Sequence, residues 1–336
     1  MRFLLLLPFA GMLLSFSGQK NVSQSETDFR KSPLSYTVGE SKRDPKLLKT
    51  QAVAEFAFEF SYIEETPTDT GHEGSYVIVM AYNGTQVRTA LDSSRKFSLA
   101  LAPGKYVFQF YCNQSYEEIK TDSIVIPAGC RTPVGVHFQS ATYPVISDKP
   151  VIYLYPEKTQ PVNVQLTNNG PLYFTYPAYN NGWNFTADPD GSLHANGKTY
   201  SYLFWDGQTN IPKSSADWSK GFIVEKDSLV SFFENKLSAM GLSAREIDDY
   251  ITYWVPRMSV NEKNYIHFSC NEEYAQFASL KITPQPDQLF RVYMIWSKAD
   301  ESVAVHPQTL PSFQRNGFTV VEWGGTEMPQ QPVALF

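Results

Sequence analysis

The sequence predicts a mainly β protein in which a small β-sandwich precedes an α+β domain with a helical hairpin. Short apolar and aromatic runs separated by turn residues fill residues 51–143, with no helical period. From residue 148 on, strand-like runs enclose two segments with helical spacing, which is typical of a single α+β domain. Aromatic residues make up 15% of the chain, and the 20 Tyr and 23 Phe suit the faces of β-sheets.

The first residues have the pattern of a signal peptide, expected over residues 1–17. Arg2 precedes an apolar run that is too short to span a bilayer, and Ser15 and Ser17 suit cleavage after Ser17. Residues 18–50 are polar and lack periodicity, so we expect a flexible leader. The pattern predicts an exported protein, periplasmic, cell-surface or extracellular, without a transmembrane segment after signal removal. An uncleaved membrane anchor is the alternative.

Residues 51–143 alternate as the strands of a sandwich do. Phe56, Phe58 and Phe60 recur at every second residue, which places them on one face of a strand. Asn83-Gly84 is the turn sequence favoured in two-residue hairpins. The other strands are predicted at residues 76–82, 97–101, 106–111, 124–126 and 134–138.

Residues 92–106 form a run with Asp92, Phe97 and the pair Pro103-Gly104 at fixed spacing. This run resembles the core of carboxypeptidase-regulatory-like, or transthyretin-like, domains. Arg95 stands where those domains usually have a glycine, so the turn differs at that point. The resemblance implies a Greek-key β-sandwich that stabilises or displays a neighbouring domain, and it implies no activity.

The second domain is expected over residues 148–328, followed by a tail at 329–336. Its opening segment, Lys149–Pro156, encloses an apolar run between two prolines, as a short buried strand would. Asp188–Gly191 has the residues of a turn. Further strands are predicted at residues 162–166, 172–176, 183–187, 200–205, 265–268, 280–282, 289–296, 303–305 and 318–323.

Two helices are predicted in the middle of this domain. Asp227 is placed to cap the first helix, and Gly241 is placed to end it. Ser243 and Glu246 have the spacing of a capping box for the second helix. Pro256 is expected to end the second helix.

Six separated segments of the second domain occur in a characteristic order. They are Lys149–Pro156, Asn181–Asn184, Asp188–Gly191, Tyr202–Trp205, Ile251–Pro256 and Val321–Glu327. Together they resemble a widespread, uncharacterised family of exported or hypothetical microbial proteins, bacterial and fungal. The resemblance covers nearly the whole domain and implies that the domain is intact. That family has no assigned biochemical function, so no catalytic residue transfers.

The three cysteines fit an exported protein. If neighbouring strands bring Cys112 and Cys130 together, an oxidising compartment lets them form a disulfide. Two separate buried thiols are the alternative. Cys270 is left over and is expected to be a small buried side chain, because His267 would point to the opposite face of its strand.

Charge and motif content argue against several classes of function. The net charge is −6 and no basic stripe is present, so nucleic acid is not an expected partner. The sequence has no zinc-protease, dithiol, nucleophile-elbow, phosphate-loop or dinucleotide signature. Its five histidines lack ligand spacing. We therefore expect no metal and no cofactor.

Aromatic and amide side chains indicate a ligand-binding surface in the second domain. The candidates are Tyr179, Asn180, Trp183, Trp205, Asp206 and Trp323. Aromatic faces stack on sugar rings or apolar side chains, while Asn and Asp fix orientation by hydrogen bonds. Core packing is the alternative, and the apolar pattern favours it for Trp205. Tyr179 and Trp183 are expected at the surface because they flank a turn sequence.

Glu322, Glu157 and Asp206 are weaker candidates for a catalytic carboxylate pair. Two converging carboxylates can act as general acid and base in glycoside hydrolysis. Glu322 interrupts an apolar strand, where a charge needs a partner. Arg257 or Arg291 can supply that partner in a purely structural ion pair, which is the favoured alternative.

These observations predict a non-enzymatic exported module that binds a glycan or a polypeptide. One alternative is a carboxylate-dependent hydrolase of a polysaccharide or cell-wall bond. Another is a structural or assembly protein of the cell envelope, whose sheet edges pair with partners.

Overall fold

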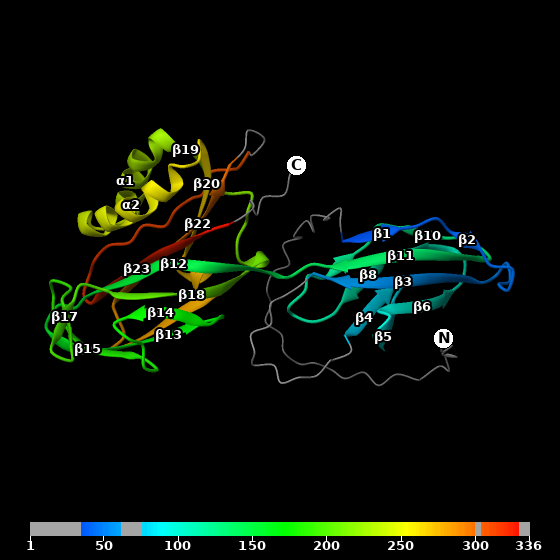
Figure 1. The fold of residues 1–336 in the computed structure, drawn as a ribbon, viewed down its shortest axis with the longest axis horizontal. Coiled ribbons are helices and arrows are strands. Elements are labelled where there is room, and N and C mark those ends of the chain that lie inside the picture. Colours follow the sequence, from blue (N-terminus) through cyan, green and yellow to red (C-terminus); the bar gives the residue numbers. More distant parts are fainter. Residues whose placement is uncertain (1–34, 62–75, 300–303, 329–336) are drawn as a thin grey trace.

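The computed structural model describes residues 35–61, 76–299 and 304–328. The protein is mainly β, with several sheets and few helices, as the sequence predicts (Figure 1). The expected signal peptide and the tail at 329–336 lie outside the described residues. Among the helices of the described part, none is both long and apolar enough to cross a membrane.

The strands before residue 139 form two main sheets. One has the order β1-β11-β3-β6, with β2 beside β11, and the other has the order β5-β4-β8-β9; β10 and β7 form a short pair. Their bounds are β1 (Tyr36–Val38), β2 (Lys42–Arg43), β3 (Ala52–Phe60), β4 (Val77–Tyr82), β5 (Thr85–Ala90), β6 (Lys96–Leu101), β7 (Gly104–Tyr106), β8 (Phe108–Tyr111), β9 (Ile119–Lys120), β10 (Ile124–Ile126) and β11 (Cys130–Phe138). β11 runs parallel to β3, so the first sheet is mixed.

The two sheets pack face to face around an aromatic core. Phe56 and Phe58 are buried, as their alternation predicts, and the Phe56 ring meets the Phe108 ring edge-on at 5.1 Å between centroids. The predicted hairpin is also present, because β4 and β5 are joined through Asn83 and Gly84, both with positive φ. We call this cluster of buried residues, drawn from residues 52–138, the sandwich core.

Part of the expected flexible leader belongs to the first sheet. Residues Tyr36–Val38 pair with β11 in register from Val134 to Val136, and Lys42–Arg43 pair with its start. The pairing gives the backbone N–H and C=O groups of these polar residues hydrogen-bond partners in the sheet, although the polar composition predicted that they would be exposed to solvent. The leader prediction is therefore wrong over these strands.

The disulfide prediction is wrong, since Cys112 and Cys130 are both free thiols. Cys112 follows β8 in one sheet, whereas Cys130 begins β11 in the other. Cys112 instead packs against the sandwich core, and burial raises the pKa of its thiol to about 11. Cys270 is half-buried against apolar residues, as expected.

The later strands form a seven-stranded sheet and a five-stranded sheet. The first has the order β14-β18-β12-β23-β22-β20-β19, and the second has the order β17-β16-β15-β13-β21. Their bounds are β12 (Thr142–Tyr155), β13 (Gln160–Asn168), β14 (Leu172–Tyr176), β15 (Trp183–Ala187), β16 (Leu193–Ala195), β17 (Lys198–Tyr200), β18 (Leu203–Pro212), β19 (Phe222–Glu225), β20 (Lys263–Cys270), β21 (Ala278–Thr283), β22 (Gln288–Lys298) and β23 (Thr319–Glu327). The predicted strand at 303–305 does not form over residues 304–305. β22 and β23 are parallel to each other.

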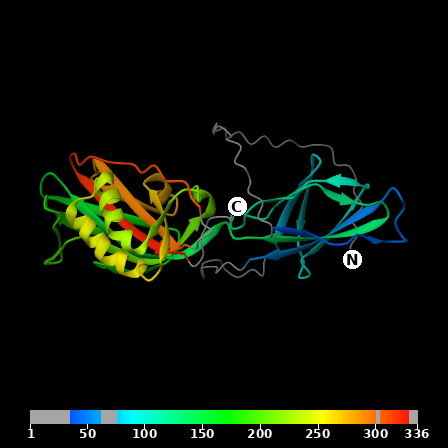
Figure 2. The ribbon, with the colours of Figure 1, turned by 90° about the horizontal axis from the view of Figure 1, so that it is seen from above.

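The seven-stranded sheet is the middle one of three layers. Helices α1 (Leu229–Met240) and α2 (Ala244–Met258) cover one face, and the five-stranded sheet covers the other (Figures 1 and 2). Ile152 and Leu154 of β12 point into the core between the two sheets, while Val151 and Tyr153 point into the core below the helices. The Lys149–Pro156 segment thus supplies the part of β12 that is buried on both faces, as predicted, but the strand is not short, because it begins at Thr142 and continues through Pro150. We call these clusters the inter-sheet core and the helix-side core.

The helical hairpin follows some of the local signals in the sequence. Ser243 and Glu246 form the predicted capping box, and Gly241 ends α1 with a left-handed φ of 101°. Asp227 does not cap α1, because it lies inside a 3₁₀ turn and Ser228 takes the N-cap position. Pro256 lies within α2, which continues to Met258, because a proline in the last turn removes only one amide donor.

Candidate functional site

A bulge in β12 organises the candidate site. The register between β12 and its neighbours shifts between Ser147 and Val151, so the strand holds an extra residue there. Lys149 occupies this bulge with a φ of 49°, which is unusual for a residue other than glycine. The bulge redirects Asp148 and Lys149 relative to a regular strand, next to β18 and β23.

Five ionisable side chains are electrostatic neighbours around this bulge. They are Asp148 and Lys149 of β12, Asp206 of β18, and Tyr253 and Arg257 of α2. We call these five the bulge cluster; the carboxylates of Asp249 and Glu327 also act electrostatically on Lys149 and Asp148, respectively. None of these side chains forms an ion pair with another residue of the described ranges at 4.0 Å or less. The cluster is therefore loosely paired rather than a closed network.

Asp206 is the most unusual member of the bulge cluster. Its Oδ1 atom is buried without a hydrogen-bond partner in the described structure. Burial raises the pKa of the Asp206 carboxyl, and a hydrogen bond from the backbone of Phe174 opposes this rise. Burial also raises the pKa of Asp148, while the charge of Arg257 opposes the rise. Two half-buried carboxyls with raised pKa values therefore lie in one cluster.

The cations of the cluster lie over aromatic rings. Lys149 Nζ is 4.8 Å from the centroid of the Tyr253 ring and 5.8 Å from that of Trp323. The guanidinium carbon of Arg257 lies 3.6 Å from the Tyr253 ring centroid, and Arg257 Nη1 donates to the Tyr253 carbonyl at 2.6 Å. Burial lowers the pKa of Lys149. Cation–π contact holds these side chains in place while leaving donors free for a ligand.

Exposed aromatic rings adjoin the bulge cluster on the edge strand β14. Tyr173, Phe174 and Tyr176 are 58%, 57% and 52% exposed, far above what core residues show. Phe174 pairs in register with Asp206, and its ring lies 5.9 Å from the ring of Phe204. A register shift between Leu172 and Phe174 leaves Tyr173 as an extra residue, and its hydroxyl reaches Gln208. We call Tyr173, Phe174, Tyr176 and Phe204 the aromatic row.

Four of the segments that carry the resemblance noted in the sequence meet at this site. Lys149, Phe204, Tyr253 and Trp323 come from four different segments, and the rings of Tyr253 and Trp323 both lie under the Lys149 ammonium group. Gly324 is also part of the packing, because a Cβ atom there would lie 2.8 Å from Pro150 Cα. The order of these segments along the chain gave no sign that they converge.

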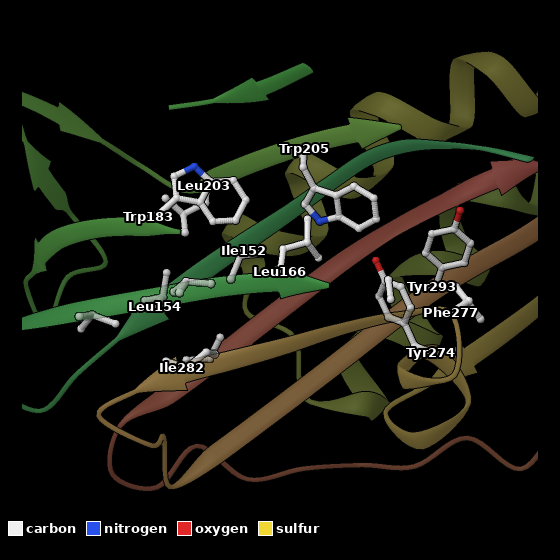
Figure 3. Packing of buried hydrophobic residues seen from close by; sticks show 14 of the residues in the cluster. Ile152, Leu154, Leu166, Trp183, Leu203, Trp205, Tyr274, Phe277, Ile282 and Tyr293 are labelled. Atoms are coloured by element: carbon white, nitrogen blue, oxygen red, sulfur yellow. The ribbon is translucent and has the colours of Figure 1, made fainter. Parts of the chain in front are cut away.

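Most of the aromatic residues predicted to bind a ligand are in the core. Trp183 and Trp205 belong to the inter-sheet core (Figure 3) and Trp323 belongs to the helix-side core. The Tyr179 hydroxyl donates to the carbonyl of Leu166 and accepts from its amide. The Tyr179 side chain therefore points towards the protein interior. These four residues do not form a binding surface. The core alternative for Trp205 is the correct one.

The other two predicted ligand-binding residues, Asn180 and Asp206, have polar side chains outside the hydrophobic cores. Asn180 is exposed in the turn between β14 and β15, but its aromatic neighbours point inwards. Asp206 is half-buried and belongs to the bulge cluster.

Glu322 forms a structural ion pair with Arg291. It is fully buried, and its Oε2 atom accepts from Arg291 Nε at 2.5 Å while Oε1 accepts from Trp205 Nε1 at 3.0 Å. Trp205 and Asp206 are consecutive in β18, so their side chains lie on opposite faces of the sheet. Glu322 therefore cannot form a carboxylate pair with Asp206. The structural alternative holds with Arg291 as the partner, not Arg257.

Glu157 is exposed beyond the end of β12. Tyr155 is six positions after Lys149 along β12, so the end of the strand that precedes Glu157 lies roughly 20 Å from the bulge. Glu157 is therefore not a member of the candidate site. The predicted turn at Asp188–Gly191 is present, with the Gly191 amide donating to the Asp188 carbonyl.

Sequence reasoning missed Asp148, Tyr253 and the exposed rings of Tyr173 and Phe174, and it considered Arg257 only as an ion-pair partner for Glu322. The segment Leu172–Tyr176 has an aromatic residue at three of its five positions, so no alternation marked which rings face solvent. A usable signal was Lys149, since a charged residue inside an otherwise apolar motif needs a specific environment.

Comparisons with known proteins give relatives without an assigned function. No protein-family model matches the chain. Over 62 residues, 18% of the chain, it is 48% identical to a protein described as an uncharacterised protein in the bglA 3′ region of Butyrivibrio fibrisolvens. The chain spans 65% of the length of that relative.

The solved structures that the chain matches include that of a DUF3823 family protein from Parabacteroides merdae. The match covers 47% of this chain and 98% of that one, with 11% sequence identity and a TM-score of 0.17. A likeness at this level supports no conclusion about the function of the chain.

Proposed function

We propose that the protein is a non-enzymatic module that binds a glycan across the bulge cluster and the aromatic row. The observation that carries this proposal is the buried, unpartnered Oδ1 atom of Asp206 beside exposed aromatic rings. A buried carboxylate oxygen without a donor lowers folding stability. A ligand hydroxyl that donates to this oxygen would account for its presence.

The aromatic row suits the apolar C–H face of a sugar ring, and the bulge cluster suits its hydroxyl groups. Phe174 and Tyr176 offer flat apolar faces for the C–H side of a pyranose. Asp148 and Asp206 accept hydrogen bonds from hydroxyls, and Arg257 donates them. Because hydroxyls both donate and accept, a neutral glycan fits this mixture of acids and bases better than a polyanion does.

The test compares binding of neutral polysaccharides (xylan, mannan and β-glucan) by affinity electrophoresis and calorimetry. Phe174→Ala and Asp206→Ala should each weaken binding about tenfold, since each removes a contact worth roughly 1.4 kcal/mol. Tyr111→Ala is the matched control, because Tyr111 is an exposed ring on β8 in the other half of the chain. Absence of binding to all three polysaccharides, or equal affinity of the variants, rejects the proposal.

A second candidate function is a carboxylate-dependent hydrolase of a glycan bond. The raised pKa values of Asp148 and Asp206 favour it, because a general acid must stay protonated near the working pH. Release of reducing sugar by the wild type, lost in both Asp148→Asn and Asp206→Asn, would support hydrolysis. Binding without release supports the module.

We propose further that the module is exported and that residues 51–143 act as its spacer. Support comes from the signal-peptide pattern and from the core clusters, since the sandwich core shares no described residue with the other two. Intact-mass measurement of the protein from its native host should give a mature chain that begins at Gly18. A mature protein that retains Met1 contradicts export by cleavage.

A further inference from the structure

We propose that the free edge of β19 is a second binding site, for an extended polypeptide strand with an acidic side chain. β19 is the last strand of the seven-stranded sheet, at the edge opposite to β14 and the aromatic row. A groove of about 650 Å³ runs between β19 and α1, and Val305 and Pro307 line it as well. The groove is therefore separate from the proposed glycan site.

The edge of β19 presents backbone groups that no described strand uses. The Lys226 amide donates to Glu262 on the β20 side, whereas the Gly221 amide donates to His306 on the outer side. Because successive residues alternate, the N–H and C=O groups of Ile223 and Glu225 also point to the outer side. Among the described strands, β19 pairs with β20 alone.

The chain itself pairs with this edge at one point. His306 forms a parallel bridge with Lys220, and it donates to the Ser219 carbonyl and accepts from the Gly221 amide, each at 2.8 Å. A second strand therefore fits beside the edge. The bridge stops before Ile223, and the groove continues from there along β19.

The wall of the groove sets the chemistry of the partner. Phe222 and Phe232 supply apolar rings, and Lys236 Nζ lies 4.8 Å and 6.0 Å from their centroids. No carboxylate in the described ranges lies within ion-pair distance of Lys236. Glu225 belongs to the opposite face of β19 from Phe222. A strand added here would thus place apolar and acidic side chains towards α1, in the mode of β-strand addition.

The test uses the full chain and a fluorescein-labelled peptide, Thr-Val-Thr-Glu-Thr-Val-Thr, in fluorescence polarisation. The same peptide with Lys in place of Glu should bind about tenfold more weakly, since it loses the charge pair with Lys236. Lys236→Glu should reverse this preference. Ile223→Pro should abolish binding of both peptides, because it removes an outward N–H that β20 does not use.

Several results would overturn the proposal. Equal affinity for the two peptides, or unchanged binding by an Ile223→Pro protein with wild-type circular dichroism, excludes docking at this edge. Self-association that Ile223→Pro abolishes, without peptide binding, assigns the edge to a second copy of the chain. Phe174→Ala should leave peptide binding unchanged, so failure here and failure of the glycan proposal are distinguishable.

Discussion

Asp206 carries a charge that the folded protein leaves partly uncompensated. Because burial raises the pKa of its carboxyl, the folded state binds the proton more tightly than the unfolded chain does. The ionised side chain therefore lowers folding stability. This loss is absent below the ordinary pKa of aspartate, near 4, and develops as the pH rises through the raised folded-state value.

Asp206→Asn should accordingly stabilise the protein at pH 7, by on the order of 1 kcal/mol or less, and have no effect near pH 3. Urea denaturation at pH 3, 5 and 7 measures the difference. Asp217→Asn is a control of opposite sign, because hydrogen bonds from Ser219 lower the pKa of Asp217. The Asp217 carboxylate thus contributes stability that is lost as the pH falls. A less stable Asp206→Asn protein at pH 7 contradicts the unpaired state of Asp206.

The charge of Glu322, unlike that of Asp206, is buried together with groups that compensate it, namely Arg291 and the Trp205 indole N–H. Arg291→Met would leave the Glu322 carboxylate buried without its cation, and should reduce the free energy of unfolding by about 3–5 kcal/mol. Adding Glu322→Gln should restore on the order of 2 kcal/mol, because the neutral amide can still accept from Trp205. Denaturant titration of the single and double variants tests this, and a loss below about 1 kcal/mol for Arg291→Met would refute it.

At the scale of single elements, the stability of α2 depends on the capping box in its first turn. The Ser243 side chain accepts from the Glu246 amide, and the Glu246 carboxylate accepts from the Ser243 amide at 2.8 Å. Glu246 is fully buried and also pairs with Arg315. The capping box therefore fixes both the start of α2 and a contact with the segment before β23.

Ser243→Ala should destabilise the protein by about 1 kcal/mol, because one amide of the first turn loses its acceptor. Ser238→Ala is the matched control, since Ser238 is an exposed helical residue near the end of α1 and alanine is a better helix former there. Thermal and urea unfolding of both variants provide the measurement. Equal stabilities for the two variants would show that the cap contributes little.

The elements that were predicted correctly are those whose signals are local. The turn at Asn83-Gly84, the helix end at Gly241 and the capping box of Ser243 and Glu246 each depend on only a few neighbouring residues. The local sequence is therefore enough to predict them. The side-chain environment of Trp183 depends instead on which sheet covers β15, and no local pattern encodes that. The bulge cluster joins residues of β12, β18 and α2, which only the chain topology brings together. No local sequence pattern predicts that these residues are neighbours.

At the scale of the whole molecule, the two halves of the chain are proposed to be separate domains. The sandwich core draws on residues 52–138, and the other two cores draw on residues 145–328. β12 begins at Thr142, before the expected boundary at residue 148, so its first residues belong to the second half. Among the contacts between the halves, Lys213 pairs with Glu117 at 3.5 Å, and both side chains are partly exposed. Such a pair contributes only about 0–1 kcal/mol.

This arrangement predicts two unfolding transitions in calorimetry of the full chain. Phe108→Ala and Phe233→Ala each truncate a fully buried ring, and each should remove about 3–5 kcal/mol of stability from its own half. Because the two cores share no described residue, Phe108→Ala should lower one transition temperature and Phe233→Ala the other. A single transition that both variants lower together would show that the halves fold as one cooperative unit. The proposed glycan site and the β19 groove both lie in the second half. At temperatures below the unfolding transition of the sandwich, Phe108→Ala should therefore leave binding at both sites unchanged.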